Sequence, residues 1–227
     1  MNYEEIYERI QNAKLKANRT SDRIFFAAVS KTRTVEEMKT AEKIPWVDFF
    51  GENRVQEAET KKKSYGACRV PWRLIGHLQN NKVRKAIEIF DTIDSVDSVE
   101  LAERIDRISG ELGKKIPVLI EVNTSGETTK SGIAPENFSE LLDFIITRKN
   151  LELQGLMTVG PLVDDEREIR NAFANLRGLS DKAKISTGLP LPLLSMGMSD
   201  DFELAILEGS TMIRIGTLLF GARIYAR

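Results

Sequence analysis

Residues Ile24–Phe50, IFFAAVSKTRTVEEMKTAEKIPWVDFF, contain the pattern that decides the fold of this 227-residue chain. The stretch begins with a short apolar run, Ile24–Val29, and ends with a second one, Trp46–Phe50, and such runs are typical of buried strands. Between them, Val35–Lys43 is charged and long enough to form a helix. A strand, a helix and a second strand in this order predict a right-handed βαβ unit of a parallel sheet.

The same alternation continues in both directions from this unit. Further helices are predicted at Tyr3–Ala17, Arg54–Lys63, Ser98–Leu112, Pro135–Arg148 and Glu166–Ser186. The other apolar runs that predict strands are Trp72–Ile75, Phe90–Ile93, Ile116–Val122, Leu151–Met157, Leu191–Leu194 and Met212–Ile215.

Eight predicted strands in 227 residues leave about 28 residues for each unit, which suits a compact barrel. We therefore predict an α/β fold, a single-domain (β/α)8 TIM-type barrel over residues 1–227 with an extra N-terminal helix. A doubly wound open sheet is the alternative, but the GxGxxG loop typical of that fold does not follow the first strand.

The composition excludes several classes of protein. The 33 basic and 34 acidic residues nearly cancel, which argues against a disordered chain and gives no charge-based reason to expect nucleic-acid binding. The single cysteine, Cys68, cannot form an internal disulfide, and the single histidine, His77, cannot form a His-rich metal site, so we expect no metal. No apolar run reaches about 18 residues, and the charged start differs from a signal peptide. We expect a soluble, cytoplasmic protein with no membrane partner.

Lys31 is the most informative residue at the carboxyl ends of the predicted strands, where barrels of this kind carry their chemistry. It follows the first strand directly, at the mouth of an apolar barrel. Partial burial would lower the pKa of its amine, and a neutral amine can form a Schiff base with a carbonyl. The alternative is a lysine that extends into solvent from the end of a strand.

A candidate anion site follows the last strand, where Arg214 precedes Gly216 and Thr217. Backbone N–H groups at this turn and the Thr217 hydroxyl can bind a phosphate, which Ser195 would approach from the end of the seventh strand. Ser199–Asp201 is expected to cap a helix, and its acids would repel an anion, so we place the phosphate away from that helix. An ordinary tight turn at Gly216 is the alternative reading.

Three further features complete the sequence reading, and two of them keep two interpretations each. His77, after the third strand, is either a general acid-base or a structural histidine. Lys61–Lys63 is expected to end a helix on a solvated face. Met157, Met196 and Met198 either line an apolar pocket or pack in the core.

A lysine and a phosphate site on one rim suit pyridoxal phosphate, which carries both an aldehyde and a phosphate. They suit equally a Schiff-base aldolase that acts on a phosphorylated sugar and holds no cofactor.

Seven ordered motifs together resemble the YggS/PROSC family, the pyridoxal phosphate homeostasis proteins. The family's barrel in turn resembles the N-terminal domain of alanine racemase. The motifs are AVSKT (Ala28–Thr32), FGENRVQE (Phe50–Glu57), WRLIGHLQNNK (Trp72–Lys82), VNTSGETTKSGI (Val122–Ile133), GLMTVGP (Gly155–Pro161), LSMGMSDDFELAI (Leu194–Ile206) and GSTMIRIGTLLFGAR (Gly209–Arg223).

The resemblance implies a role for each candidate site residue. Lys31 would hold pyridoxal phosphate as an internal aldimine, and Arg214 would face the pyridine nitrogen of the cofactor. A guanidinium only donates hydrogen bonds, so that nitrogen would stay unprotonated and the ring would be a poor electron sink. The remaining positions implied to contact the cofactor are Asn53, His77 and Met157 around the ring and Ser195, Gly216 and Thr217 at the phosphate.

The resemblance leaves open whether the protein is an enzyme or a carrier. Two-base racemases of this fold use a tyrosine from a β domain of a partner subunit, and the sequence ends at Arg227, directly after the predicted barrel. None of its tyrosines, Tyr3, Tyr7, Tyr65 and Tyr225, falls at a predicted strand end. We therefore expect a monomeric protein that buffers pyridoxal phosphate or delivers it to apoenzymes, without efficient catalysis. A slow amino-acid racemase with the same cofactor is the alternative.

Overall fold

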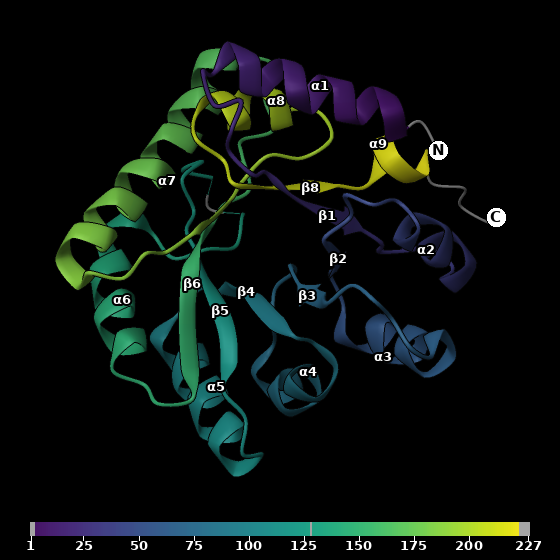
Figure 1. Ribbon diagram of the computed structural model, residues 1–227. Coiled ribbons are helices and arrows are strands. Elements are labelled where there is room, and N and C mark those ends of the chain that lie inside the picture. The colour runs from purple at the N-terminus through teal and green to yellow at the C-terminus, as the bar shows by residue number, and fades with distance from the viewer. Residues whose placement is uncertain (1–2, 128, 223–227) are drawn as a thin grey trace.

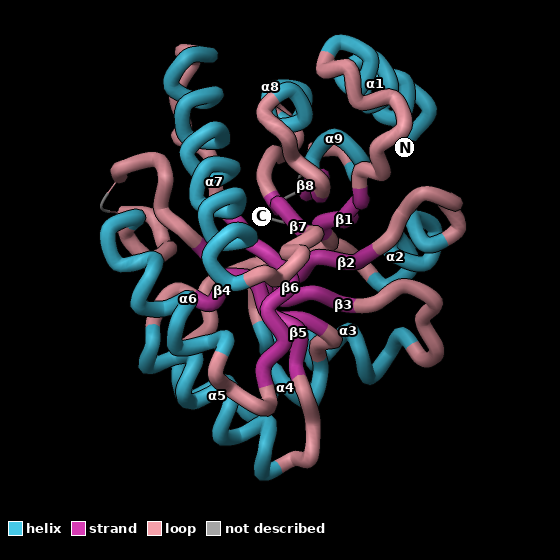
Figure 2. The backbone as a smooth tube through the Cα atoms, turned by 60° about the vertical axis from the view of Figure 1, so that its left-hand side comes forward, coloured by secondary structure: helices cyan, strands magenta, loops and turns pink. Residues whose placement is uncertain are grey.

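The computed structural model describes residues 3–127 and 129–222 of the chain. Tyr225, and two residues within the quoted motifs, Thr128 and Arg223, lie outside the described residues. Within this part of the chain, eight parallel strands close into a barrel in sequence order, and the last strand pairs with the first. Helices surround the strands, as Figures 1 and 2 show. The predicted (β/α)8 TIM-type barrel is confirmed.

The strands are β1 (Phe25–Val29), β2 (Phe49–Glu52), β3 (Trp72–Leu74), β4 (Thr92–Val96), β5 (Ile116–Glu121), β6 (Leu151–Met157), β7 (Leu193–Ser195) and β8 (Met212–Ile215). The helices are α1 (Tyr3–Lys16), α2 (Val35–Glu42), α3 (Val55–Tyr65), α4 (Val83–Ile89), α5 (Val99–Glu111), α6 (Phe138–Ile146), α7 (Glu166–Thr187), α8 (Phe202–Leu207) and α9 (Thr217–Phe220). Two 3-10 turns, Asn80–Lys82 and Pro135–Asn137, lead into α4 and α6.

Every predicted strand overlaps an observed one, and the largest shifts are in β2 and β4. We expected a strand at Trp46–Phe50, but it begins at Phe49, because Trp46 lies in the turn that follows α2. The Trp46 ring packs edge-on against Phe26 at 4.6 Å and beside Tyr7 of α1 at 6.0 Å. Its apolar character therefore serves the packing of α1 on the barrel and not a strand.

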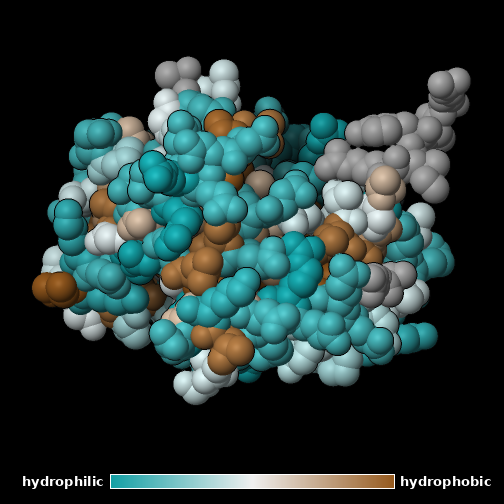
Figure 3. Space-filling view, turned by 90° about the horizontal axis from the view of Figure 1, so that it is seen from above, coloured by the Kyte–Doolittle hydropathy of each residue, from teal (hydrophilic) through white to brown (hydrophobic). Residues whose placement is uncertain are grey.

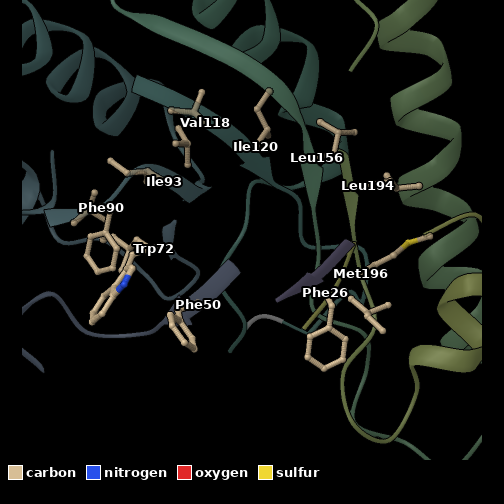
Figure 4. Packing of buried hydrophobic residues seen from close by; sticks show 14 of the residues in the cluster. Phe26, Phe50, Trp72, Phe90, Ile93, Val118, Ile120, Leu156, Leu194 and Met196 are labelled. Atoms are coloured by element: carbon tan, nitrogen blue, oxygen red, sulfur yellow. The ribbon is translucent and has the colours of Figure 1, made fainter. Parts of the chain in front are cut away.

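The hydrophobic core lies mainly between the strands and the surrounding helices. Burying one large apolar side chain in such a layer contributes roughly 1.5–3 kcal/mol. Figure 4 shows outward-facing side chains of successive strands in this layer, among them Phe26, Phe50, Trp72, Ile93, Ile120, Leu156 and Leu194.

Helix α3 is fixed on the barrel by a group of aromatic rings. Tyr65, at the end of α3, lies edge-on to Trp72 of β3 at 5.7 Å and to Phe50 of β2 at 6.0 Å. Edge-to-face pairs of this kind add about 0.5–1.5 kcal/mol to the burial of the rings. The orientation of α3 matters for the site, because this helix packs behind the carboxyl ends of β1 and β2.

The barrel interior contains an apolar cluster and a buried ion pair. Leu119, Met157, Leu193 and Met212 form one buried cluster. Arg73 of β3 pairs with Asp94 of β4 through two hydrogen bonds of 2.8 Å. Because both groups are buried, each needs the other to offset its loss of hydration.

The surface seen from above in Figure 3 is mostly hydrophilic, and its hydrophobic residues gather in small separate patches. Within residues 3–127 and 129–222, no helix combines the length and apolar character needed to cross a membrane.

Candidate functional site

A cavity of about 340 Å³ opens at the carboxyl ends of the strands. Five of the eight predicted site residues line it, namely Lys31, Asn53, Arg214, Gly216 and Thr217. The rest of its wall is formed by Val29, Ile75, Val159, Met198, Ser199 and Asp200. The barrel topology explains this convergence, because parallel strands bring all of their carboxyl ends to one rim.

Lys31 lies in a tight turn directly after β1. The turn is closed by a hydrogen bond from the Arg33 N–H to the Ser30 carbonyl oxygen, at 3.0 Å. Arg33 then reaches across to α9, where its guanidinium donates to the carbonyl oxygens of Phe220 and Gly221. The lysine turn and the segment after β8 are thereby joined on one side of the cavity.

Arg214 is a buried cation whose position is fixed by three hydrogen bonds. Its Nη1 donates to the Ser195 carbonyl oxygen at 2.9 Å and to Ser195 Oγ at 2.8 Å. Its Nη2 donates to the Thr158 carbonyl oxygen at 2.8 Å. Burial lowers the pKa of the Arg214 guanidinium, and the carboxylates of Asp201, Asp94 and Glu121 oppose that shift. The group remains a hydrogen-bond donor.

Ser195 and Met157 lie behind the cavity and do not line it. Ser195 is fully buried, and its hydroxyl accepts a hydrogen bond from Arg214. Met157 is fully buried in the interior cluster with Leu119 and Met212. Neither residue therefore reaches a ligand in the cavity directly, and each would act on it through the residues that line the cavity.

His77 lines a neighbouring cavity of about 370 Å³, which shares Asn53 with the first. Its side chain is 56% exposed, and its Nδ1 lies 3.3 Å from the Asp97 carboxylate. The two cavities meet at Asn53, so the structure places His77 beside the Lys31 cavity and not on its wall.

The expected helix cap at Ser199 is wrong. Helix α8 begins only at Phe202, and Asp201 occupies the N-cap position. The Asp201 carboxyl accepts a hydrogen bond of 2.5 Å from the Met198 N–H, while Ser199 Oγ accepts one of 3.3 Å from the Leu218 N–H. The loop after β7 is thus tied to α9, and Ser199 and Asp200 line the cavity beside Gly216.

The prediction of a solvated face for the lysine run is wrong at its first residue. Lys61 is only 8% exposed. Its ammonium donates to the Ser30 carbonyl oxygen and to Glu52 Oε1, both at 2.7 Å. Lys61 also pairs with Glu57 Oε1 at 2.6 Å, and only this contact has a signal in the sequence, because the two residues are four apart and lie on one face of a helix.

Glu121, at the end of β5, is a buried acid that sequence reasoning missed. Its Oε2 has no hydrogen-bond partner within the described residues. Burial and the nearby Asp97 raise the pKa of Glu121 to about 7, although Arg214 opposes the shift. An isolated Glu at a strand end carries no pattern that distinguishes it from an exposed one.

Known proteins resemble this chain over nearly its whole length. Residues 2–224 match the family model for the N-terminal domain of alanine racemase. A pyridoxal phosphate homeostasis protein from Aquifex aeolicus is 40% identical over 227 residues, which cover 97% of this chain and 96% of that relative. The chain belongs to the pyridoxal phosphate homeostasis family. The resemblance inferred from the seven motifs is confirmed.

Two solved structures are similar to this family member over almost their whole length. PipY of Synechococcus elongatus PCC7942, solved with pyridoxal phosphate bound, superposes with a TM-score of 0.81 at 36% identity and covers 94% of this chain and 99% of its own. A protein of Bifidobacterium adolescentis described as unknown has a TM-score of 0.88 at 39% identity, covering 95% and 92%.

The residues of the cavity fit the cofactor named for this family. Its volume lies in the range of small-molecule sites, about 300–1,000 Å³. The lining combines the Lys31 amine, the Arg214 guanidinium and the Thr217 hydroxyl with apolar side chains such as Val29 and Ile75. Asn53 Oδ1 is buried without a hydrogen-bond partner in the described part of the chain. The same part contains no cluster of three His, Cys, Asp or Glu residues that could bind a metal ion.

Proposed function

We propose that this protein binds pyridoxal phosphate through a Schiff base on Lys31 and acts in pyridoxal phosphate homeostasis, by buffering the cofactor or delivering it to apoenzymes. The observation that carries the proposal is the single cavity shared by Lys31, Arg214 and Thr217. The cofactor bound to PipY and the names of the curated relatives support it. We assign this activity to residues 1–227 as one domain, acting as a monomer in the cytoplasm.

The covalent step needs no further reactant. The Lys31 amine adds to the aldehyde carbon, a C=N bond replaces the C=O bond, and one water leaves with the aldehyde oxygen and both amine hydrogens. Gly216 and Thr217 would bind the phosphate through backbone N–H groups and the Thr217 hydroxyl. The Cβ of any other residue at Gly216 would lie 3.4 Å from Val29, so a longer side chain would occupy the space of the cavity.

The residues outside the cavity wall have indirect roles in this proposal. Ser195 holds the Arg214 guanidinium at its place, and Met157 forms the packed interior below it. His77 lines the neighbouring cavity, which shares Asn53 with the Lys31 cavity.

Arg214 gives a physical reason for the absence of efficient catalysis. A donor facing the pyridine nitrogen requires that nitrogen to be unprotonated. The cofactor supplies an electron sink for carbanion chemistry, and an unprotonated ring supplies a weaker one. The proposal is therefore a carrier and not a transaminase or a fast racemase.

An absorbance spectrum with borohydride reduction tests the anchor. We expect the protein with pyridoxal phosphate to show a visible band that borohydride removes, with the added mass on a peptide containing Lys31. Lys31→Ala should lose both signals. Lys43→Ala, which removes an exposed lysine close by in the sequence, should keep them. Absence of the band in the unmodified protein would overturn the proposal.

A second assay tests the carrier role. The loaded protein is incubated with single-enantiomer amino acids, and optical activity is followed. We expect no loss above the rate of free cofactor. Loss that depends on Lys31 would contradict the carrier proposal and favour the slow racemase.

A further inference from the structure

The backbone directly after Lys31 is held in an unusual conformation. Thr32 has a φ of +64°, in the left-handed region that residues other than glycine rarely adopt. Such a residue persists only where neighbouring contacts hold it. Lys31 therefore projects from a turn whose shape depends on contacts outside the turn.

Those contacts converge on Lys61 of α3. Its ammonium lies 2.7 Å from the Ser30 carbonyl oxygen, 2.7 Å from Glu52 Oε1 and 2.6 Å from Glu57 Oε1. An ammonium has three N–H donors, so these acceptors use its full capacity.

The two carboxylates extend the network to both neighbours of Lys31. Glu52 Oε1 also accepts a hydrogen bond of 2.7 Å from Ser30 Oγ. Glu57 Oε1 also accepts one of 2.5 Å from the Thr32 N–H. Ser30 precedes Lys31 and Thr32 follows it, so one buried ammonium and two carboxylates hold the turn from each side.

General stability does not explain this arrangement well. Buried ion pairs stabilise a fold little compared with apolar residues of the same size, because their dehydration offsets their attraction. Glu52 illustrates the cost, since burial raises the pKa of its carboxyl against the effect of Lys61, and its Oε2 has no hydrogen-bond partner in the described chain. The benefit of the network is geometric, because it sets the direction in which Lys31 leaves the barrel.

We propose that Lys61, with Glu52 and Glu57, is a positioning group that aims the Lys31 amine into the cavity and so sets the rate at which the Schiff base forms. This inference rests on the proposed function. It assigns a role to residues that touch only the backbone and side chain beside Lys31, and not the cofactor.

Glu57 is the best residue to change, because its side chain is 26% exposed and its loss leaves most of the buried network in place. The matched control is Glu59 on the same helix, which is 31% exposed and pairs with Lys63 by the same spacing of four residues. Glu59 pairs instead with Lys63 and Lys85, on the part of α3 away from the Lys61 network.

The experiment is a stopped-flow measurement of Schiff-base absorbance at increasing pyridoxal phosphate concentration. Saturation separates the half-saturating concentration, which reports initial binding, from the limiting rate, which reports attack by the amine. We expect Glu57→Ala to lower the limiting rate about tenfold and change the half-saturating concentration less than about twofold. Glu59→Ala should match the unmodified protein. Glu57→Gln keeps an oxygen that accepts from the Thr32 N–H and should restore the rate to within about twofold.

Lys61→Met supplies a second test, with thermal unfolding measured in parallel. If Lys61→Met folds, we expect its limiting rate to fall by more than about tenfold, because all three contacts of the Lys61 ammonium with the turn network are lost. If it does not fold, the Glu57 and Glu59 pair decides the question. Equal limiting rates in Glu57→Ala and Glu59→Ala, or a change confined to half-saturation, would overturn the positioning role while leaving the proposed function intact. Absence of any Schiff base in the unmodified protein would overturn both.

Discussion

Single charged residues inside the barrel differ sharply in how well they are compensated. Arg73 and Asp94 satisfy each other through two hydrogen bonds. Arg214 has three acceptors but no carboxylate within hydrogen-bond distance in the described structure. Glu121 has the opposite sign and lies close enough for Arg214 to lower its pKa, yet burial dominates and raises it. The ionisation of Glu121 is therefore costly near neutral pH.

Glu121 gives a prediction for the pH dependence of stability. Its pKa is about 7 in the folded protein and 4.5 as its ordinary value, so the folded state binds this proton more tightly. The contribution of Glu121 to the free energy of unfolding must then fall as pH rises from about 4.5 to about 7. Glu121→Gln cannot ionise, and between pH 5 and pH 8 we expect its stability relative to the unmodified protein to increase by about 2–3 kcal/mol.

Urea unfolding at pH 5, 6, 7 and 8 measures this difference directly. Glu152→Gln is the control, because Glu152 is an exposed acid on the neighbouring strand β6. The control should differ from the unmodified protein by a constant amount across the range. A constant difference for Glu121→Gln as well would contradict the raised pKa.

Among the elements, β6 and β7 approach each other more closely than a side chain permits. A Cβ at Gly155 would lie 1.8 Å from the Leu193 carbonyl oxygen, and the φ of Gly155 is +154°. The strand register also shifts on this side of the barrel, between Val118 and Leu119 of β5 where it pairs with β6. Gly155 is therefore required by the close approach of β6 and β7.

Gly155→Ala should destabilise the protein by about 3–5 kcal/mol, because the backbone of β6 or β7 must move to admit the methyl group. Gly178→Ala is the matched control, since Gly178 lies inside α7 and a Cβ there would meet no atom within 4 Å. That control should gain about 0.5–1 kcal/mol from its higher helix propensity. Denaturant unfolding of both variants checks the signs, and a neutral Gly155→Ala would show that the strands can separate without cost.

The sequence predicts best those helices and strands whose bounds are set by neighbouring residues along the chain. The long helices α5 and α7 are preceded by the N-cap residues Ser98 and Asp165, whose side chains cap the first turn. The sequence predicts the bounds of both helices to within about one residue. Trp46 and Lys61 were misread because their environment is set by tertiary contacts. An aromatic residue in a turn and a lysine inside a charged run look like a strand and a solvated face until the packing of α1 and α3 is known.

For the molecule as a whole, the barrel topology explains why the sequence could predict which strand ends contribute residues to the site. Residues after β1, β2 and β8 had to meet, and Lys31, Asn53 and Thr217 do line one cavity. The sequence could not predict which of these side chains line the cavity and which are buried behind it. Ser195 and Met157 belong to strands that reach the cavity, but their side chains point into the packed interior, which depends on strand register and tilt.

This construction of the cavity predicts how the cofactor changes the stability of the whole chain. Lys31 and Thr217 lie near opposite ends of the sequence, and six of the eight strand ends contribute to the wall, so the unfolded chain contains no equivalent site. A ligand that binds only the folded state stabilises it by about 2.7 kcal/mol at 100 times its Kd. For a domain of this size that corresponds to a rise in Tm of about 5–10 °C.

Because the linkage is logarithmic, Tm should keep rising with each tenfold increase in pyridoxal phosphate concentration. Lys31→Ala keeps the phosphate contacts but cannot form the covalent bond, so its Tm should rise less at every concentration. A Tm that stays constant while the absorbance band saturates would show that the cofactor binds folded and unfolded chains alike, which this cavity does not permit.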